Sequence, residues 1–396
     1  MTSLALAIFS VTLQVVVAAQ VSQPLSETID VNVVNVDVTV LDRHRNPVRG
    51  LTARDFEVFE DGKPQKITNF YAIEAAVPRV EGSATPQLAQ VEKRFHRKAV
   101  LLVDNIFVEK PRRDFALSEV QKFMERKFTD DYEWAIGTIG GAIQTNLPFT
   151  TDKTKLADVI DRIRCSGTLT YHDDVDQGIF ADLRRQETMG EFQRNIAAME
   201  GLIALSKLAR GLIDACRAYS SSDGKKLVVL VTGAIETDNR SPMAIDAANQ
   251  PSWKQHSREN AREAGHILET MVREANAANF NVYIINANGL VSPVAVDAGA
   301  HRSESMGAGG FNSPHTGRDF DSFPLALASE TGGAYLRSND LADSLRQIDT
   351  ESSNYYSLGY APSHPGDGKY HAIDVRVKRT GVSIRYRAGY AASGTS

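Results

Sequence analysis

Residues 98–105 read KAVLLVDN, a run of apolar residues that follows one lysine and ends at Asp104. Such a continuous run is typical of a central parallel strand that is buried on both faces. Three later segments have the same character and are predicted to be strands: 134–139, 227–232 and 281–286. Helical spacing of apolar residues predicts helices around 117–124, 156–163, 191–217, 257–277, 323–330 and 341–349. This alternation predicts right-handed βαβ units and a doubly wound, mostly parallel α/β domain over residues 98–350.

Both ends of the chain have a different pattern. Residues 31–41 (VNVVNVDVTVL) alternate between apolar and polar side chains, and Asp61-Gly62 is a hairpin signal, so residues 28–76 are predicted to be β. Residues 354–392 alternate in the same way, whereas residues 77–97 are typical of a linker. Because a few strands rarely form a stable domain alone, we expect both ends to pair into one small β-sandwich with the α/β domain inserted. Separate small β modules are the alternative.

The composition is that of an ordinary globular protein. The 396 residues favour two domains, and 42% hydrophobic and 23% charged residues provide a sizeable core. A net charge of −5 gives no general reason to expect a nucleic-acid or membrane-surface partner. The last strands are basic, but outward charges also protect strand edges, so a solvated face is favoured over a nucleic-acid or anionic-glycan site. These residues are Lys369, Arg376, Lys378, Arg379, Arg385 and Arg387.

The first residues resemble a secretory leader. From Leu4 to Ala19 the chain is uncharged and mostly apolar, and Val17-Ala18-Ala19 resembles a cleavage site, although no Lys or Arg precedes the run. The run is short for a membrane span. We therefore predict a signal peptide at residues 1–19 and a periplasmic, cell-surface or secreted protein without a transmembrane span after cleavage. An uncleaved anchor or a buried strand is the alternative.

Two cysteines, Cys165 and Cys216, are too few for a disulfide-stapled scaffold. In an oxidising compartment they could form one bridge, or they could remain two free thiols. The sequence spacing of the two cysteines is compatible with either a disulfide bridge or two free thiols.

Searches for catalytic motifs find no G-x-S-x-G, P-loop, G-x-G-x-x-G after the first strand, or H-E-x-x-H. The one tight group of a histidine with acids is His172-Asp173-Asp174, with Asp176 close by, in a polar segment. This group is expected to be a solvated loop, and a hydrolase that uses it is the less favoured alternative. The protein is therefore predicted not to be an enzyme.

Asp104 stands at the end of the first buried strand, where ligands bind in open α/β sheets. Here the chain resembles the von Willebrand factor A family, and more closely the VWFA-related proteins typical of Acidobacteria. The resemblance spans residues 28–392. It rests on five segments: 31–67 (VNVVNVDVTVLDRHRNPVRGLTARDFEVFEDGKPQKI), 98–105 (KAVLLVDN), 225–233 (KKLVVLVTG), 327–336 (LASETGGAYL) and 355–390 (YYSLGYAPSHPGDGKYHAIDVRVKRTGVSIRYRAGY).

The resemblance implies a metal-ion-dependent adhesion site made from an Asp-x-Ser-x-Ser turn, a loop threonine and an aspartate after a later strand. Asp104 matches the first aspartate and Thr168 the loop threonine. The remaining three positions carry no side-chain oxygen: Ile106, Val108 and Gly233. Since Mg²⁺ prefers near-octahedral oxygen ligands, we expect a degenerate site and no bound metal. The alternative is a site rebuilt from substitute ligands: Glu236, Asp238 or Asp173.

The expected function is that of an exported binding or scaffolding protein. Its strand-end rim, with the loops 169–190 and 299–322, would bind a protein or cell-surface partner. The candidate ligand-binding residues are Asp104, Thr168 and Asp238. Metal-dependent adhesion through substitute ligands is the second hypothesis.

Overall fold

The computed structural model describes twelve stretches of the chain: 33–75, 77–80, 96–127, 132–140, 143–167, 190–220, 224–233, 235, 251–287, 322–337, 340–364 and 366–392. The predicted signal peptide at residues 1–19 lies outside these residues, as do both rim loops, apart from Gly190 and Ser322, each at the start of a helix. Within the described part, no helix is both long enough and apolar enough to cross a membrane.

A six-stranded sheet forms the α/β part, with the order β11-β10-β9-β6-β7-β8. All neighbouring pairs are parallel except β7 and β8, which are antiparallel. The mixed α/β fold with a mostly parallel sheet agrees with the sequence prediction. The strands are β6 (Arg97–Asp104), β7 (Tyr132–Ile139), β8 (Ile143–Thr150), β9 (Lys225–Thr232), β10 (Phe280–Asn286) and β11 (Tyr335–Leu336).

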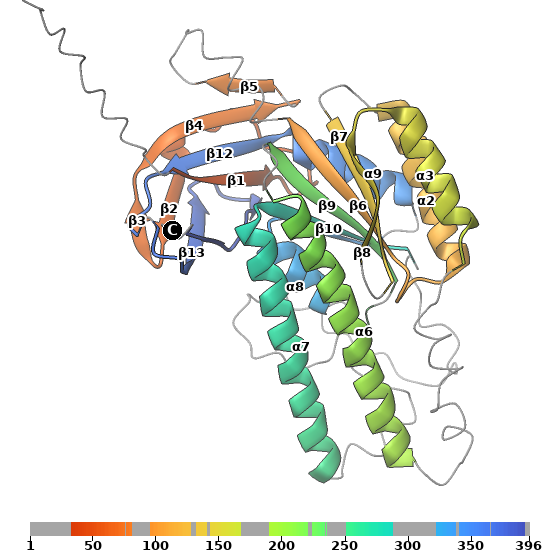
Figure 1. Cartoon of the computed structure of the whole chain (residues 1–396). Coiled ribbons are helices and arrows are strands. Elements are labelled where there is room, and N and C mark those ends of the chain that lie inside the picture. Colours follow the sequence, from red (N-terminus) through yellow and green to blue (C-terminus); the bar gives the residue numbers. More distant parts are fainter. Residues whose placement is uncertain are drawn as a thin grey trace, which may run out of the picture. The chain divides into compact units, whose positions relative to one another are not determined.

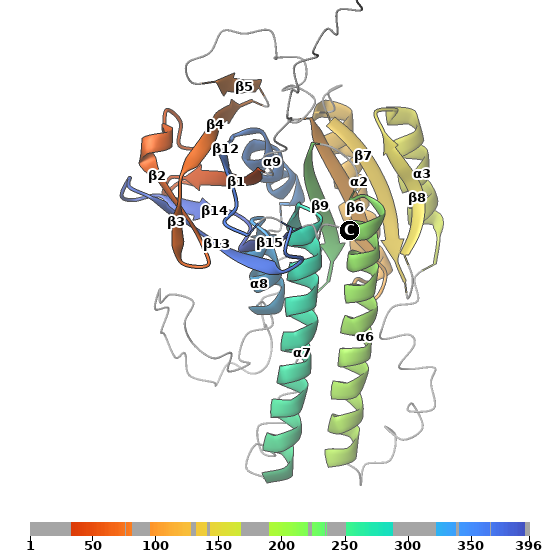
Figure 2. The ribbon, with the colours of Figure 1, turned by 60° about the vertical axis from the view of Figure 1, so that its left-hand side comes forward.

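Helices cover both faces of this sheet because its central strands are apolar on both sides. In β6, Leu101 and Val103 pack with α2 (Lys110–Lys127), α3 (Lys153–Cys165) and α9 (Leu341–Ser353). Val100 and Leu102 point the other way and pack with α6 (Gly190–Ala218), α7 (Pro251–Ala277) and α8 (Ser322–Glu330). Figure 1 shows α2 and α3 together beside the sheet, and Figure 2 shows α6 and α7 side by side.

Strands from both ends of the chain pair with one another. One five-stranded sheet has the order β14-β1-β12-β4-β5, and a four-stranded sheet has the order β15-β13-β2-β3. N-terminal β1 lies between two C-terminal strands, with Asp37 opposite Ser357 and Val40 opposite Ile384. The strands are β1 (Val34–Leu41), β2 (Phe56–Glu60), β3 (Lys63–Gln65), β4 (Ile67–Glu74), β5 (Val77–Val80), β12 (Tyr355–Tyr360), β13 (Tyr370–Val377), β14 (Ser383–Arg385) and β15 (Gly389–Ala391). A short 3-10 helix, Ala53–Asp55, precedes β2.

Two strands differ from the sequence-based expectations, and the state of the two cysteines, which the sequence left open, is now described. Residues 77–80, expected in a linker, form strand β5, which pairs antiparallel with β4. The edge strand β8 was not predicted, and it runs antiparallel at the end of the parallel sheet. Both cysteines are free: Cys165 is exposed at the end of α3, and Cys216 is buried on α6.

Charged side chains connect the terminal strands to the α/β part. The Lys225 ammonium lies 3.4 Å from an Asp37 carboxylate oxygen and 3.4 Å from the centre of the Tyr355 ring. Arg385 of β14 binds Glu351 of α9 at 2.6 Å, and the Glu351 side chain is almost fully buried. Because buried charges are stable only when paired, these contacts fix how β1 and β14 meet the α/β part.

A buried histidine holds together the loop before β13 and the β2–β3 hairpin. The Nδ1 atom of His371 lies 2.8 Å from an Asp61 oxygen, and its Nε2 atom lies 3.0 Å from an Asp367 oxygen. The ring also stacks on His364 and contacts Tyr390. The hydrogen bonds to Asp61 and Asp367 raise the pKa of His371 above its usual 6.5, and burial opposes this shift.

The raised pKa of His371 predicts a pH dependence of stability. The unfolded chain loses the histidine proton near its ordinary pKa, so this contribution is complete below about pH 6.5 and is lost as pH rises through the higher folded value. We expect His371→Gln to cost about 1 to 2 kcal/mol of unfolding free energy at pH 6 and less at pH 9. Urea unfolding at both pH values measures this, with exposed His266→Gln on α7 as the matched control. An equal loss at both pH values would contradict the assignment.

Candidate functional site

The carboxyl ends of β6 and β9 meet at one edge of the parallel sheet. Strand β6 lies between β9 and β7. The helix that follows β6, α2, packs on one face of the sheet, and the helix that follows β9, α7, packs on the other. This is the arrangement in which open α/β sheets bind ligands beyond the strand ends. Asp104 ends β6 and Thr232 ends β9, so both residues lie at this rim.

The Asp104 carboxylate is completely buried and is engaged by the protein itself. Oδ1 accepts a hydrogen bond from the backbone N–H of Ile106 at 2.7 Å, and Oδ2 accepts one from Phe107 N–H at 3.3 Å. The Thr232 hydroxyl donates to Oδ2 at 2.5 Å. Asp104 therefore stabilises the turn between β6 and α2, which begins at Lys110. It also links this turn to the end of β9 through Thr232.

Burial raises the pKa of the Asp104 carboxyl from 3.8 to about 6. The hydrogen bond from Thr232 and those from the backbone of Ile106 and Phe107 favour the carboxylate and limit the rise. A carboxyl with such a pKa could serve as a catalytic acid if it were accessible. At 0% exposure, Asp104 cannot touch a substrate in this conformation.

The positions that would complete an adhesion-type metal site face the hydrophobic core. Ile106 belongs to the cluster with α6 and α7, and Val108 belongs to the cluster with α2 and α3. Gly233 follows Thr232 and has no side chain. With both Asp104 oxygens engaged internally, these residues do not fit a Mg²⁺ ion, which needs about six oxygen ligands. Among the described residues no group of three or more His, Cys, Asp or Glu could hold a metal ion.

Of the predicted site residues, only Asp104 can be placed. Thr168 and Asp238 lie outside the described residues, and so do the proposed substitute ligands Glu236 and Asp173. His172, Asp174 and Asp176 of the alternative hydrolase site also lie outside them. The structure instead brings Asp104 to Thr232, a partner that the sequence analysis missed. The signal was the polar residue that ends the run LVVLVT at 227–232.

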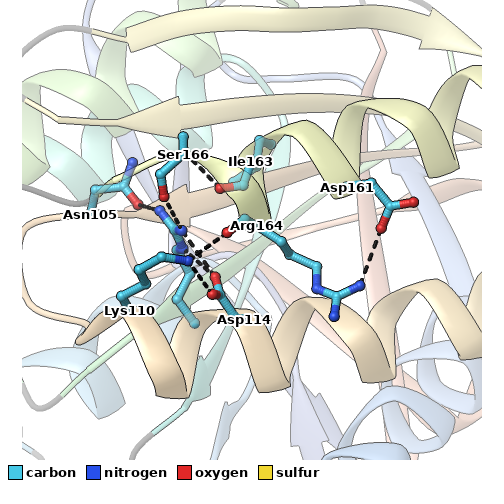
Figure 3. Close-up of polar contacts among 8 residues, drawn as sticks. Asn105, Lys110, Asp114, Asp161, Ile163, Arg164 and Ser166 are labelled. Carbon is cyan, nitrogen blue, oxygen red and sulfur yellow. Dashed lines mark hydrogen bonds and ion pairs between the residues drawn. The ribbon is translucent and has the colours of Figure 1, made fainter.

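A second polar group at the rim centres on Arg113 of α2, whose side chain is fully buried. Its guanidinium donates to Asp114 Oδ1 through Nε at 3.0 Å and Nη2 at 2.9 Å. Nη1 donates to Asn105 Oδ1 at 3.0 Å, and Nη2 also donates to the Ser166 carbonyl at 2.8 Å. Arg113 thus ties the turn after β6 to the end of α3, and Figure 3 shows the residues of this group.

Lys110 completes this rim cluster, which we define as Asn105, Lys110, Arg113, Asp114, Arg164 and Ser166. The Lys110 ammonium binds Asp114 Oδ2 and donates to the Arg164 carbonyl at 2.5 Å. Asp114 is therefore shared by two cations, one buried and one partly exposed. The sequence signal was Lys110-Pro111-Arg112-Arg113, which places three basic residues in a first helical turn, where acidic residues are usually favoured.

Comparisons with known proteins find similar solved structures but no similar sequence. No model of a protein family matches the sequence, and no curated protein matches it. Similar solved structures include BatB from Bacteroides thetaiotaomicron (12% identity, 64% of this chain, 96% of that chain, TM-score 0.33) and a von Willebrand factor type A protein from Catenulispora acidiphila (9%, 85%, 74%, 0.36). A mutant PilB minor pilin from Streptococcus sanguinis is also similar (8%, 80%, 88%, 0.33). All three TM-scores are below 0.5.

Proposed function

We propose that this chain is an exported, non-enzymatic binding or scaffolding protein with a von Willebrand A-like domain and a degenerate metal site. In this proposal the terminal strands form a small β-sandwich that carries the α/β domain. The rim at the ends of β6 and β9 binds a protein or cell-surface partner without a metal ion.

One observation carries the proposal. The Asp104 carboxylate, which would be the central metal ligand, is fully buried and accepts hydrogen bonds from Ile106, Phe107 and Thr232. Binding a cation would require it to give up donors that would then be buried without partners, at about 1 to 3 kcal/mol each. The Asp104 carboxylate is thus better suited to stabilising the turn after β6 than to coordinating a metal ion.

Two measurements test metal independence. Thermal unfolding with millimolar MgCl₂ is expected to match unfolding in NaCl of equal ionic strength. A pull-down from the native envelope is expected to recover the same partners with and without EDTA. In parallel, the Asp104→Ala variant tests whether the rim conformation matters for capture, since the loss of its hydrogen bonds frees the turn after β6.

The alternatives give different results. A magnesium-dependent rise in melting temperature that disappears in Asp104→Ala would support metal-dependent adhesion through substitute ligands. Turnover of a hydrolase substrate that is lost in Asp174→Asn would support the enzyme. Capture that EDTA abolishes would overturn the proposed function.

A further inference from the structure

A groove runs along the surface between the two long helices α6 and α7. Both helices cover the same face of the parallel sheet, and Figures 1 and 2 show them side by side and extending past the strands. The groove has a volume of about 450 Å³, and its apolar lining comes from Ala209, Ile213 and Ile267. The Arg217 guanidinium of α6 joins the helices by binding both carboxylate oxygens of Glu274 on α7, at 2.8 and 2.9 Å. The pair therefore presents a hollowed outer face.

One stripe of α6 follows the groove and continues beyond it. Ile213, Arg210 and Ser206 line the groove, and Ile203 and Met199 follow at the same alternating steps of three and four residues. Such spacing is that of a helix seam that packs against another helix. Met199 and Ile203 are 51% and 49% exposed, although both are large and apolar. The single chain thus leaves the apolar end of this seam open.

The two walls of the groove differ in charge. Arg210 and Arg217 line it from α6, whereas Glu263 lines it from α7. Because Arg217 is already paired with Glu274, the exposed guanidinium and carboxylate outside this pair are Arg210 and Glu263. Asp214 of α6 also lines the groove but is half-buried. A face that is basic along one helix and acidic along its neighbour is complementary to a second copy of itself.

The charges also select how two copies meet. A two-fold axis parallel to the helices places α6 of each copy on α7 of the other, so Arg210 faces the acidic wall of the second copy. The Arg217–Glu274 pair marks one level on both helices, and counting back from it puts Arg210 and Glu263 about one helical turn apart along the axis. An axis across the helices would place α6 on α6, with Arg210 against a basic wall. The parallel arrangement is therefore favoured.

From these observations we infer that the outer face of α6 and α7 binds a second copy of this chain, so that the two helix pairs form a four-helix bundle. Met199 and Ile203 then pack against the projecting half of α7 of the second copy, and the two symmetric pairs of Arg210 with Glu263 fix the register. The inference is independent of the proposed function, because it concerns the outer face of two helices and not the strand ends that form the rim.

Sedimentation equilibrium of the full chain tests the inference. Loading concentrations from about 1 to about 100 μM bracket a micromolar Kd, and the wild type is expected to reach twice the mass of one chain in this range. Ile203→Glu is expected to weaken the dimer about tenfold, because a charge replaces an apolar contact at the interface. The matched control is Phe115→Glu on α2, which changes a 51% exposed residue on the other side of the sheet. The control is expected to dimerise like the wild type.

A charge exchange between copies makes the test specific. Arg210→Glu alone places two carboxylates together at each contact, and Glu263→Arg alone places two guanidinium groups together, so each variant is expected to dimerise about tenfold more weakly. An equimolar mixture of the two variants restores an opposite pair at both contacts and is expected to regain the wild-type Kd. Pairing of Arg210 with Glu263 inside one chain would give no such recovery on mixing.

Three results would overturn the inference. The first is a wild type that stays monomeric at about 100 μM. If Ile203→Glu also lowered the melting temperature of that monomer, the chain's own residues would be what covers this face. The second is a dimer that neither Ile203→Glu nor Arg210→Glu weakens, since its contact would lie elsewhere. The third is a mixture of Arg210→Glu and Glu263→Arg that dimerises no better than either variant alone.

Discussion

Replacing Asp104 with Asn is expected to stabilise the protein by about 2 to 3 kcal/mol at pH 8 and to change little at pH 4. The pKa of this carboxyl rises from 3.8 to about 6 on folding. Its contribution to stability is therefore complete below pH 3.8 and is lost as pH rises through about 6. Asparagine is neutral at every pH, and its side-chain oxygen can still accept from the Ile106 and Phe107 N–H groups while its amide meets the Thr232 hydroxyl.

Urea unfolding from pH 4 to pH 8 measures this effect. The wild type should lose stability across that range relative to Asp104→Asn, and exposed Asp158→Asn on α3 should stay within about 0.5 kcal/mol of the wild type. The same comparison bears on the metal question. If Asp104→Asn were less stable than the wild type at pH 8, the anion would be needed there, as it would be for a bound cation.

Arg113→Leu is expected to destabilise the protein by about 3 to 5 kcal/mol, because it removes a fully buried cation from its ion pair with Asp114 and takes the donor away from two further oxygens. The lost guanidinium makes four hydrogen bonds, to Asp114, Asn105 and the Ser166 carbonyl. Asp114 keeps Lys110, which limits the loss to the lower part of this range. Equilibrium unfolding in urea at pH 7 gives the value.

Two further variants make the Arg113 result specific. Arg112→Leu changes the exposed neighbour and should cost less than about 0.5 kcal/mol. The double variant Arg113→Leu/Asp114→Leu removes both partners of the ion pair and should be more stable than Arg113→Leu alone. A double variant that is no more stable would mean that Asp114 is not the partner that makes Arg113 important.

Much of the fold could be predicted because the signals were local. The uninterrupted apolar run at 99–103 required a strand buried on both faces, and the regular helical spacing of Leu156, Val159, Ile160 and Ile163 required α3. Strand β8 was not predicted because residues 143–150 show no clear alternation of apolar and polar side chains, and its pairing with β7 contains register shifts. Strand β5 was not predicted because its proline-containing sequence resembles a linker. Only its pairing with β4 makes this segment a strand.

The candidate site could be predicted only in part. The place of Asp104 followed from a strand end, and the absence of side-chain oxygens at Ile106 and Val108 could be read from the sequence. The contact between Asp104 and Thr232 joins residues 128 positions apart, and no periodicity encodes such a contact. The Arg113 framework was missed because basic residues are normally exposed, and its burial depends on oxygens from Asn105 and Ser166 that only the folded chain brings close.

The order of synthesis gives the pairing of the chain ends a consequence for biogenesis. Strand β1 is made before the α/β part, but its partners β12 and β14 are made only after the α/β part. Until then its backbone lacks these partners and presents edges that other chains can bind. A polypeptide that lacked β12 and β14 would therefore keep the edges of β1 unpaired, which favours aggregation and proteolysis.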